Sequence, residues 1–160
     1  MTEFQTRAAA EWLLSAAPDP AECRRQWGRG PQGMVLLPAG VKWDVLILPG
    51  VLGHPTLDVL SRCAGRPGPV LSGAGGVRLG FFVPPGTASR WLGTGVRAVG
   101  RGTWIVVPHP GRAAGVVSWL VRPDGSGTPN GPWLLEVAMS EAWLLYTSDA
   151  ADDATRGYGV

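Results

Sequence analysis

The apolar and polar positions divide the chain into short segments that end at glycine or proline. Four of these segments have the pattern of amphipathic helices. Two of them begin with a capping residue, Thr2 in the first and Asp19 followed by Pro20 in the second. Apolar side chains gather on one side of such a segment, as the helical period requires. We therefore expect helices over residues 2–15, 19–27, 55–63 and 132–142.

The remaining apolar runs are short and bounded by glycine and proline, which predicts strands. Residues 45–48 are apolar at every position, and this is typical of a strand that is covered on both faces. Helices and strands do not alternate regularly, so the pattern indicates an α+β fold with a largely antiparallel sheet flanked by helices. The expected strands span residues 34–38, 43–49, 70–71, 77–83, 96–99, 104–107 and 116–121.

The last part of the chain differs in composition from the rest. Residues 144–153 resemble the translation of a transposon-end adapter used in sequencing libraries, and residues 143–160 hold both tyrosines and three of the twelve acidic residues. We therefore expect one domain over residues 1–142 and an artefactual tail over residues 143–160. The alternative is a genuine acidic C-terminus. Residues 1–142 alone carry 13 Lys and Arg against 9 Asp and Glu, a net charge of +4 instead of +2.

Length and charge narrow the possible classes of protein. One hundred and sixty residues suit a single domain, and a net charge of +2 gives no strong general attraction to nucleic acid. No apolar stretch approaches the roughly 18 residues of a membrane span, and the first residues lack the pattern of a signal peptide. We expect a cytoplasmic protein without membrane contact, in which Cys23 and Cys63 are reduced thiols.

Several familiar motifs are incomplete in this sequence. The glycines of residues 73–76 nearly form a dinucleotide-binding fingerprint, but Arg78 replaces the third glycine and a strand follows, so the pattern favours a hairpin turn. Cysteine and histidine residues are scattered rather than spaced as zinc ligands. No set of carboxylates is placed to converge on a metal, and no serine lies in a nucleophile motif. We expect no catalytic residue, no metal and no cofactor.

Two segments share a glycine turn, a buried strand and a closing proline, namely residues 72–86 and 96–110. Together with the strand that ends at Pro49, they resemble the N-terminal domain of bifunctional DNA primase/polymerases, in the archaeo-eukaryotic primase superfamily. The resemblance covers roughly residues 34–122. As a whole, the chain also resembles reduced forms of this domain in high-GC actinobacteria. The resemblance implies a primase–polymerase-like fold and a connection with DNA replication.

The resemblance also implies that the catalytic residues of the family are replaced. Family members carry two aspartates on one strand, a histidine on the next and a third aspartate later. The acids bind metal there, and the histidine contacts the nucleotide phosphate. In this chain Leu46 and Leu48 stand at the positions of the first two acids. Arg78 stands at the histidine and Arg97 at the third acid, and Trp104 replaces an aromatic residue.

The predicted function is therefore a catalytically inactive module that binds single-stranded DNA or a nucleotide through an arginine-lined cleft. The expected binding residues are Arg78, Arg97, Arg101 and His109. Against this stands the interpretation that the three arginines are ordinary surface residues at strand ends.

Two other functions stay open at this point. A structural or protein-interaction module without a ligand would expose some of its tryptophans, with Trp27, Trp91 and Trp133 as candidates. An active primase or polymerase would use acids elsewhere, such as Asp44 and Asp58, and would need magnesium or manganese.

Overall fold

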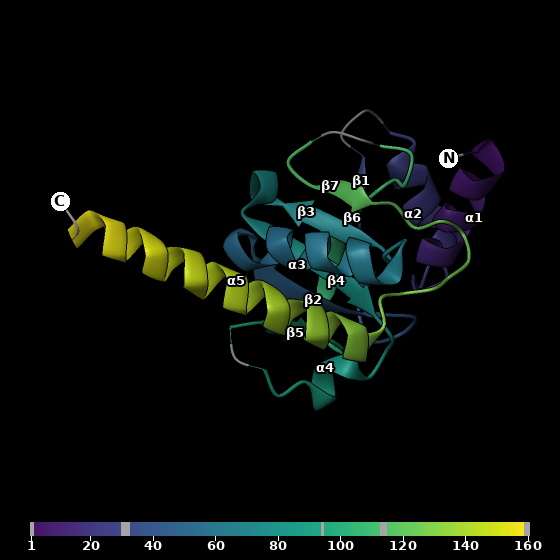
Figure 1. Cartoon of the computed structure of the whole chain (residues 1–160). Helices are drawn as coiled ribbons and strands as arrows, with labels where there is room; N and C mark the ends of the chain where they lie inside the picture. Colours follow the sequence, from purple (N-terminus) through teal and green to yellow (C-terminus); the bar gives the residue numbers. More distant parts are fainter. Residues whose placement is uncertain (1, 30–32, 94, 113–114, 159–160) are drawn as a thin grey trace.

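The computed structural model describes the chain except residues 1, 30–32, 94, 113–114 and 159–160, and it describes no side chain at residue 64 or after residue 145. Helices and strands follow the mixed order that the sequence predicts (Figure 1). The elements are α1 (Glu3–Leu14), α2 (Pro20–Trp27), β1 (Met34–Pro38), β2 (Asp44–Pro49), α3 (Gly50–Ala64), β3 (Val70–Gly73), the short helix η1 (Ala74–Gly76), β4 (Arg78–Val83), α4 (Thr87–Arg90), β5 (Arg97–Val99), β6 (Trp104–Pro108), β7 (Ser118–Val121) and α5 (Pro132–Tyr158).

The strands form two antiparallel sheets, which confirms the predicted α+β class. The larger sheet has five strands in the order β5-β2-β4-β3-β7, and β1 pairs with β6 in a separate ribbon. β2 and β4 lie inside the larger sheet, and β5 and β7 lie at its edges. Among the described residues, no helix is long and apolar enough to cross a lipid bilayer.

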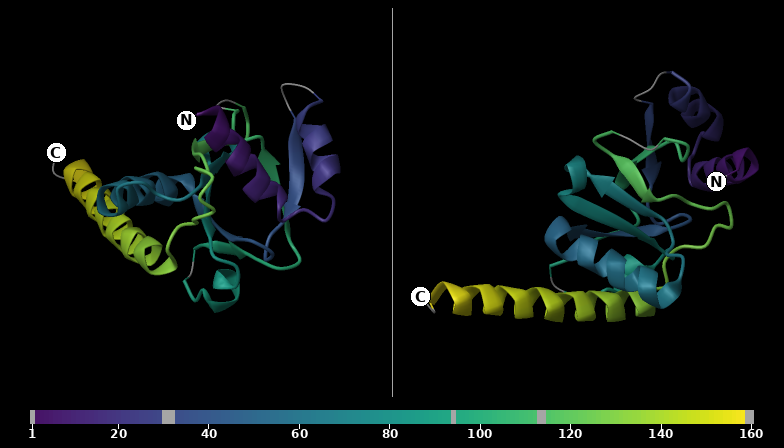
Figure 2. Two further views of the ribbon diagram at one scale, coloured as in Figure 1. Left: turned by 90° about the vertical axis from the view of Figure 1, so that its right-hand side faces the viewer. Right: turned by 45° about the horizontal axis from the view of Figure 1, so that its top comes forward.

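The five-stranded sheet is covered on both faces (Figure 2). Helices α3 and α5 lie on one face, and the β1–β6 ribbon with α1 and α2 lies on the other. We call these the helix face and the ribbon face. Because side chains alternate along a strand, each inner strand supplies both cores. On β2, Val45 belongs to the core of the ribbon face, whereas Leu46 and Leu48 belong to the core of the helix face.

The predicted caps of the first two helices are confirmed. The Thr2 side chain accepts from the backbone N–H of Gln5, and the Gln5 side chain accepts in return from the backbone N–H of Thr2. The Asp19 side chain accepts from the backbone N–H of Glu22, and Pro20 begins α2. These side chains satisfy backbone donors that a helix start leaves without a partner inside the helix.

Three helices differ from the expectation. α3 begins at Gly50 rather than at residue 55, and Pro55 lies inside it. A proline is favoured at the first helical position, which is why the sequence pattern placed the start there. The added turn brings Leu52 into the core of the helix face. The short helix α4 was not predicted, and α5 continues from residue 142 to Tyr158.

Candidate functional site

Arg78 and Arg97 extend from the same face of the larger sheet. Arg97 on β5 pairs with Ile47 of β2, and Arg78 on β4 pairs with Pro49 of the same strand. Residues directly opposite each other in an antiparallel pair point to the same face. Ile47 and Pro49 are two residues apart and share that face, so both arginines lie on the ribbon face. The spacing of strands and the two-residue offset put their Cα atoms about 12 Å apart.

The two arginines line a groove between the sheet and strand β6. Its main part has a volume of about 320 Å³, and a neighbouring hollow of about 330 Å³ shares Ile47, Arg78 and Arg97 with it. We call the two together the β6 groove. Its floor comes from β2, β3, β4 and β5, and one wall comes from β6 and the residue before it. The lining residues are Val45, Ile47, Pro49, Leu71, Gly73, Val77, Arg78, Gly80, Gly95, Arg97, Val99, Thr103, Trp104, Ile105, Val106 and Val117.

The charge of the β6 groove is entirely positive. Arg78 and Arg97 are its charged lining residues, and no aspartate or glutamate lines it among the residues that the structure describes. Both side chains are exposed, and neither takes part in an ion pair within the described chain. A guanidinium group without a carboxylate partner keeps its donors available to a phosphate or carboxylate of a ligand. The groove is therefore suited to an anion.

Leu46 and Leu48, which the resemblance puts at the positions of the first two acids, do not line the β6 groove. Leu46 and Leu48 point to the helix face, where both are fully buried, and they do not approach the arginines. The β2 residues on the groove face are Ile47 and Pro49. Residues 45–48 are all apolar, so their pattern does not reveal which side chains face which way.

Arg101 does not line the β6 groove. It lies in the turn between β5 and β6, which packs closely on the turn after β1. Gly40 in that second turn has φ +89°, and a Cβ added there would come within 2.6 Å of the Arg101 Cα. The close approach explains the glycine at position 40. It fixes the Arg101 backbone outside the groove, although the side chain itself is exposed.

His109 also lies apart from the groove, beyond the opposite end of β6 from Trp104. Its ring packs edge-on against Trp27, with ring centroids 5.2 Å apart, and its Nδ1 accepts from the backbone N–H of Gly111. Burial and the neighbouring Arg112 guanidinium lower the pKa of His109, so the ring is neutral over a wider pH range than a free histidine. The predicted four-residue cleft is therefore divided, with Arg78 and Arg97 in one place and Arg101 and His109 in two others.

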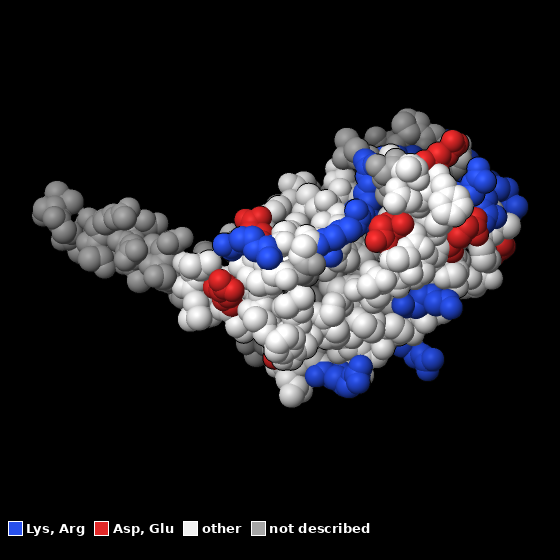
Figure 3. Space-filling model, turned by 45° about the vertical axis from the view of Figure 1, so that its right-hand side comes forward, with Lys and Arg blue, Asp and Glu red and all other residues white. Residues whose placement is uncertain are grey.

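The hollow beside His109 is larger but mixed in charge. It has a volume of about 670 Å³ and lies between α1, α2 and the segment after β6. Arginines line it, but so do Glu3 and Glu11, and Glu11 forms an ion pair of 2.6 Å with Arg24. Figure 3 shows acidic and basic side chains mixed over the end of the molecule that carries α1 and α2. This hollow is less suited to an anion than the β6 groove.

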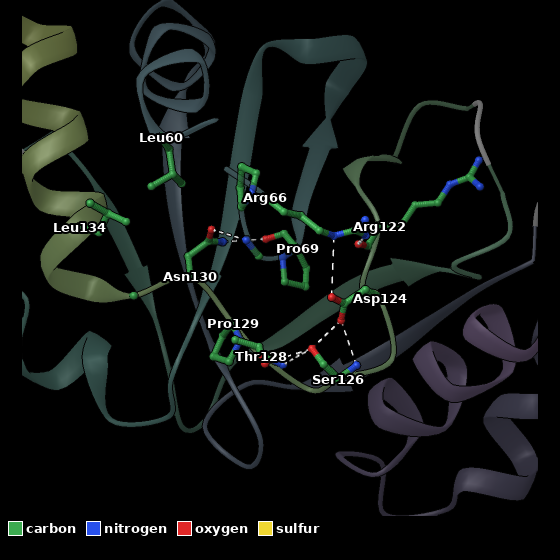
Figure 4. A pocket seen from close by; sticks show the side chains of 13 residues that line it. Leu60, Arg66, Pro69, Arg122, Asp124, Ser126, Thr128, Pro129, Asn130 and Leu134 are labelled. Carbon is green, nitrogen blue, oxygen red and sulfur yellow. Dashed lines mark hydrogen bonds and ion pairs between the residues drawn. The ribbon is translucent and has the colours of Figure 1, made fainter. Parts of the chain in front are cut away.

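A third hollow, of about 240 Å³, is lined by polar groups that already bond to one another (Figure 4). Arg66 pairs with Asp124 at 3.7 Å, and the Asp124 carboxylate accepts from Ser126. The buried Asn130 side chain accepts from the Gly68 N–H and donates to the Phe82 carbonyl. These contacts hold the loop before α5 against β4. The polar groups of this hollow therefore serve to hold the fold together, and the hollow is not a candidate binding site.

The acids considered for an active enzyme lie away from the groove. Asp44 is buried, on the helix face of β2, and one carboxylate oxygen accepts from the backbone N–H groups of Gly86 and Ala88 at 2.9 Å each. This carboxylate holds the start of α4. Asp58 is exposed on α3, across the sheet from the arginines. Within the described part of the chain, no group of three or more His, Cys, Asp or Glu side chains could hold a metal ion.

Trp104 and Gly80 also line the β6 groove, and neither is among the predicted binding residues. Trp104 lines the wall with half of its side chain exposed, and Gly80 lies in the floor. The sequence could have indicated Gly80, because residues two apart on a strand share a face and Arg78 is a predicted binding residue. The place of Trp104 in the groove depends on the pairing of β1 with β6, and no local sequence pattern indicates that pairing.

Comparison with protein families gives one match. The family model described as "Bifunctional DNA primase/polymerase, N-terminal" matches residues 3–134, most of the chain. The match extends over all elements from α1 to the first turn of α5 and includes both arginines of the groove. No curated protein and no solved structure gives a significant match.

Proposed function

The chain belongs to the family of bifunctional DNA primase/polymerase N-terminal domains, and on that premise we propose that it binds single-stranded DNA without catalysing phosphoryl transfer. The β6 groove is the binding site, and Arg78 and Arg97 bind the phosphates. A single observation carries the proposal. Among the residues that the structure describes, the groove holds two exposed arginines without an acidic partner, and the exposed Trp104 also lines it. Positive grooves with aromatic walls are typical of proteins that bind single strands.

The groove lacks the ligands that catalysis would need. Metal-assisted phosphoryl transfer requires carboxylates that converge on the ions. The β2 side chains between the two arginines are Ile47 and Pro49, which have no oxygen in the side chain. The two guanidinium groups would also repel a divalent cation. The same charges favour a phosphate, so the groove supports binding better than it supports the reaction.

The proposal predicts salt-dependent binding that each arginine supports. Binding of a labelled oligothymidylate is measured by fluorescence anisotropy over a series of salt concentrations. For single strands the slope of log K against log salt is about 0.7 per phosphate contact. We expect Arg97→Ala and Arg78→Ala each to reduce that slope by about 0.7. Arg62→Ala is the control, because Arg62 is an exposed arginine on α3, beyond the opposite face of the sheet.

Two results would contradict the proposal. Binding that is independent of salt, or equal losses in the Arg62 and Arg97 variants, would exclude the β6 groove as the phosphate site. A primer-synthesis assay with magnesium or manganese is the second arm, and we expect no product. Product formed with either metal would contradict the inactive module and support the active enzyme.

One observation favours a second candidate, a protein-interaction module. Of the three tryptophans expected to be informative, Trp27 is buried, Trp91 is partly buried and Trp133 is 75% exposed. Trp133 and Val137 lie on the same side of α5 and are both exposed. An apolar stripe of this kind is typical of helices that contact another protein. Replacing Trp133 and Val137 by serine should change the molar mass in light scattering if a second copy occupies the stripe.

A further inference from the structure

The floor of the β6 groove contains a glycine, Gly80, in the middle of strand β4. Gly80 faces the groove and lies opposite Ile47 on β2 and Leu71 on β3. Its φ is outside the left-handed region, so the backbone conformation does not require glycine here. Glycine inside a strand weakens it, and it is typical of a place where a ligand or another backbone comes close.

No neighbouring backbone occupies the place above Gly80. Within 4 Å, an added Cβ would meet only Val45 Cγ1 at 3.0 Å and Leu71 Cβ at 3.9 Å among the described residues. Both of these atoms belong to the floor itself. Strand β6, across the groove, does not come that close. Glycine at this position leaves room for the Val45 side chain, and no side chain of its own rises from the floor of the cavity of about 320 Å³.

The surroundings of this place are apolar and aromatic. The floor beside Gly80 consists of branched side chains, Ile47 among them, and Trp104 is one of the residues of the wall. The guanidinium groups of Arg78 and Arg97 lie at the same groove. A ligand that joins a flat apolar group to a phosphate could contact the apolar lining and the arginines at the same time. A nucleobase is such a group, and bases stack on exposed aromatic side chains.

We propose that one unstacked base of the bound single strand enters the β6 groove over Gly80 and stacks on Trp104. This rests on the proposed function and extends it, because the arginines alone would bind the backbone and ignore the bases. The site then requires a base at that position of the strand, whereas a purely electrostatic groove would accept any phosphate chain.

The test compares two ligands that differ only in their bases. One is an oligothymidylate, and the other is an oligonucleotide of the same length built of abasic sites, so both have the same phosphate charges. Affinities are measured by competition at fixed salt. Stacking of one base corresponds to roughly a 5- to 150-fold difference in affinity, so we expect the oligothymidylate to bind more tightly by that factor.

Variants of the groove identify the residues responsible. Gly80→Ala should fill the floor, and Trp104→Ala should remove the stacking surface. Each should bring the affinity for oligothymidylate down to that for the abasic strand, and Trp104→Phe should restore most of the difference. Trp133→Ala is the control, since Trp133 is an exposed tryptophan on α5 that does not line the groove. Thermal unfolding of each variant shows whether the fold is retained, and Trp104→Ala suffices if Gly80→Ala is unstable.

The outcomes separate this inference from the proposal on which it rests. Equal affinity for the two strands, with salt-dependent binding retained, would overturn the base site and leave the arginine groove intact. Salt-dependent binding of neither strand would overturn the arginine groove and the base site together. A difference between the strands that persists in the Trp104 and Gly80 variants would place the base elsewhere and overturn the inference.

Discussion

Neighbouring residues of β2 lie in opposite environments although all are apolar. Leu46 and Leu48 are fully buried under α3 and α5, whereas Ile47 is partly exposed in the β6 groove. A shift of one residue along a strand exchanges the two faces. The sequence pattern could locate this strand and show that it is covered on both sides, but it could not distinguish the two sets of side chains. That distinction comes from the pairing with β4 and β5.

The alternation along β2 is testable with one charge placed at neighbouring positions. Leu46→Asp puts a carboxylate into the helix-face core without a partner, and we expect it to lower the free energy of unfolding by more than about 3 kcal/mol. Ile47→Asp puts the same group beside Arg97 in the groove, and its effect should be less than half as large. Urea unfolding followed by circular dichroism measures both. Equal destabilisation by the two variants would contradict the assignment of faces.

At the scale of elements, α5 has a buried part and a part that extends beyond the body of the molecule (Figure 1). Leu135, Ala138 and Ala142 are its residues in the core of the helix face, and Ala142 is the last of them. Among the described side chains the core part of this helix ends at Ala142, and the domain boundary after that residue stays a prediction. The continuation of the helix does not test whether residues 143–160 are artefactual, which stays a prediction.

Shortening α5 tests how far the folded domain extends. A chain that ends at Ala142 keeps every core residue that the structure describes in this helix, so its free energy of unfolding should differ from that of the full chain by less than about 1 kcal/mol. A chain that ends at Leu134 loses all three core residues and should not unfold cooperatively. Denaturant unfolding of the two chains is the measurement. A large loss of stability in the longer one would show that residues 143–160 belong to the domain.

Sequence reasoning was most successful for elements with local signals. The caps at Thr2 and Asp19 and the seven predicted strands correspond to elements of the structure, because capping and apolar runs depend on neighbours in the sequence. The start of α3 was missed because a local preference, proline at the first turn, was outweighed by the burial of Leu52. The site was predicted only in part. Arg78 and Arg97 are in the five-stranded sheet and Trp104 is in the β1–β6 ribbon, and no local pattern shows how the sheet and the ribbon pack together.

For the whole molecule, the five-stranded sheet lies between the proposed binding groove and the helices α3 and α5. The groove lies on the ribbon face, and α3 and α5 cover the other. A net charge of +2 gives no general attraction to DNA, so any binding must come from local charge. The groove provides that locally, because its two arginines have no acidic neighbours in the lining.

Strands β2 and β4 have a hydrophobic core on each face, and this should determine how fast their backbone amides exchange with solvent. Their amide hydrogens are shielded by a core on each side, so they should exchange with deuterium only when both layers separate, at a rate close to that of global unfolding. The edge strand β5 and the β1–β6 ribbon should exchange faster. Single-stranded DNA bound in the β6 groove should slow amide exchange in β5 and β6 and leave the exchange rates of β2 and β4 unchanged. Exchange measured with and without oligothymidylate would then map the occupied face by mass spectrometry.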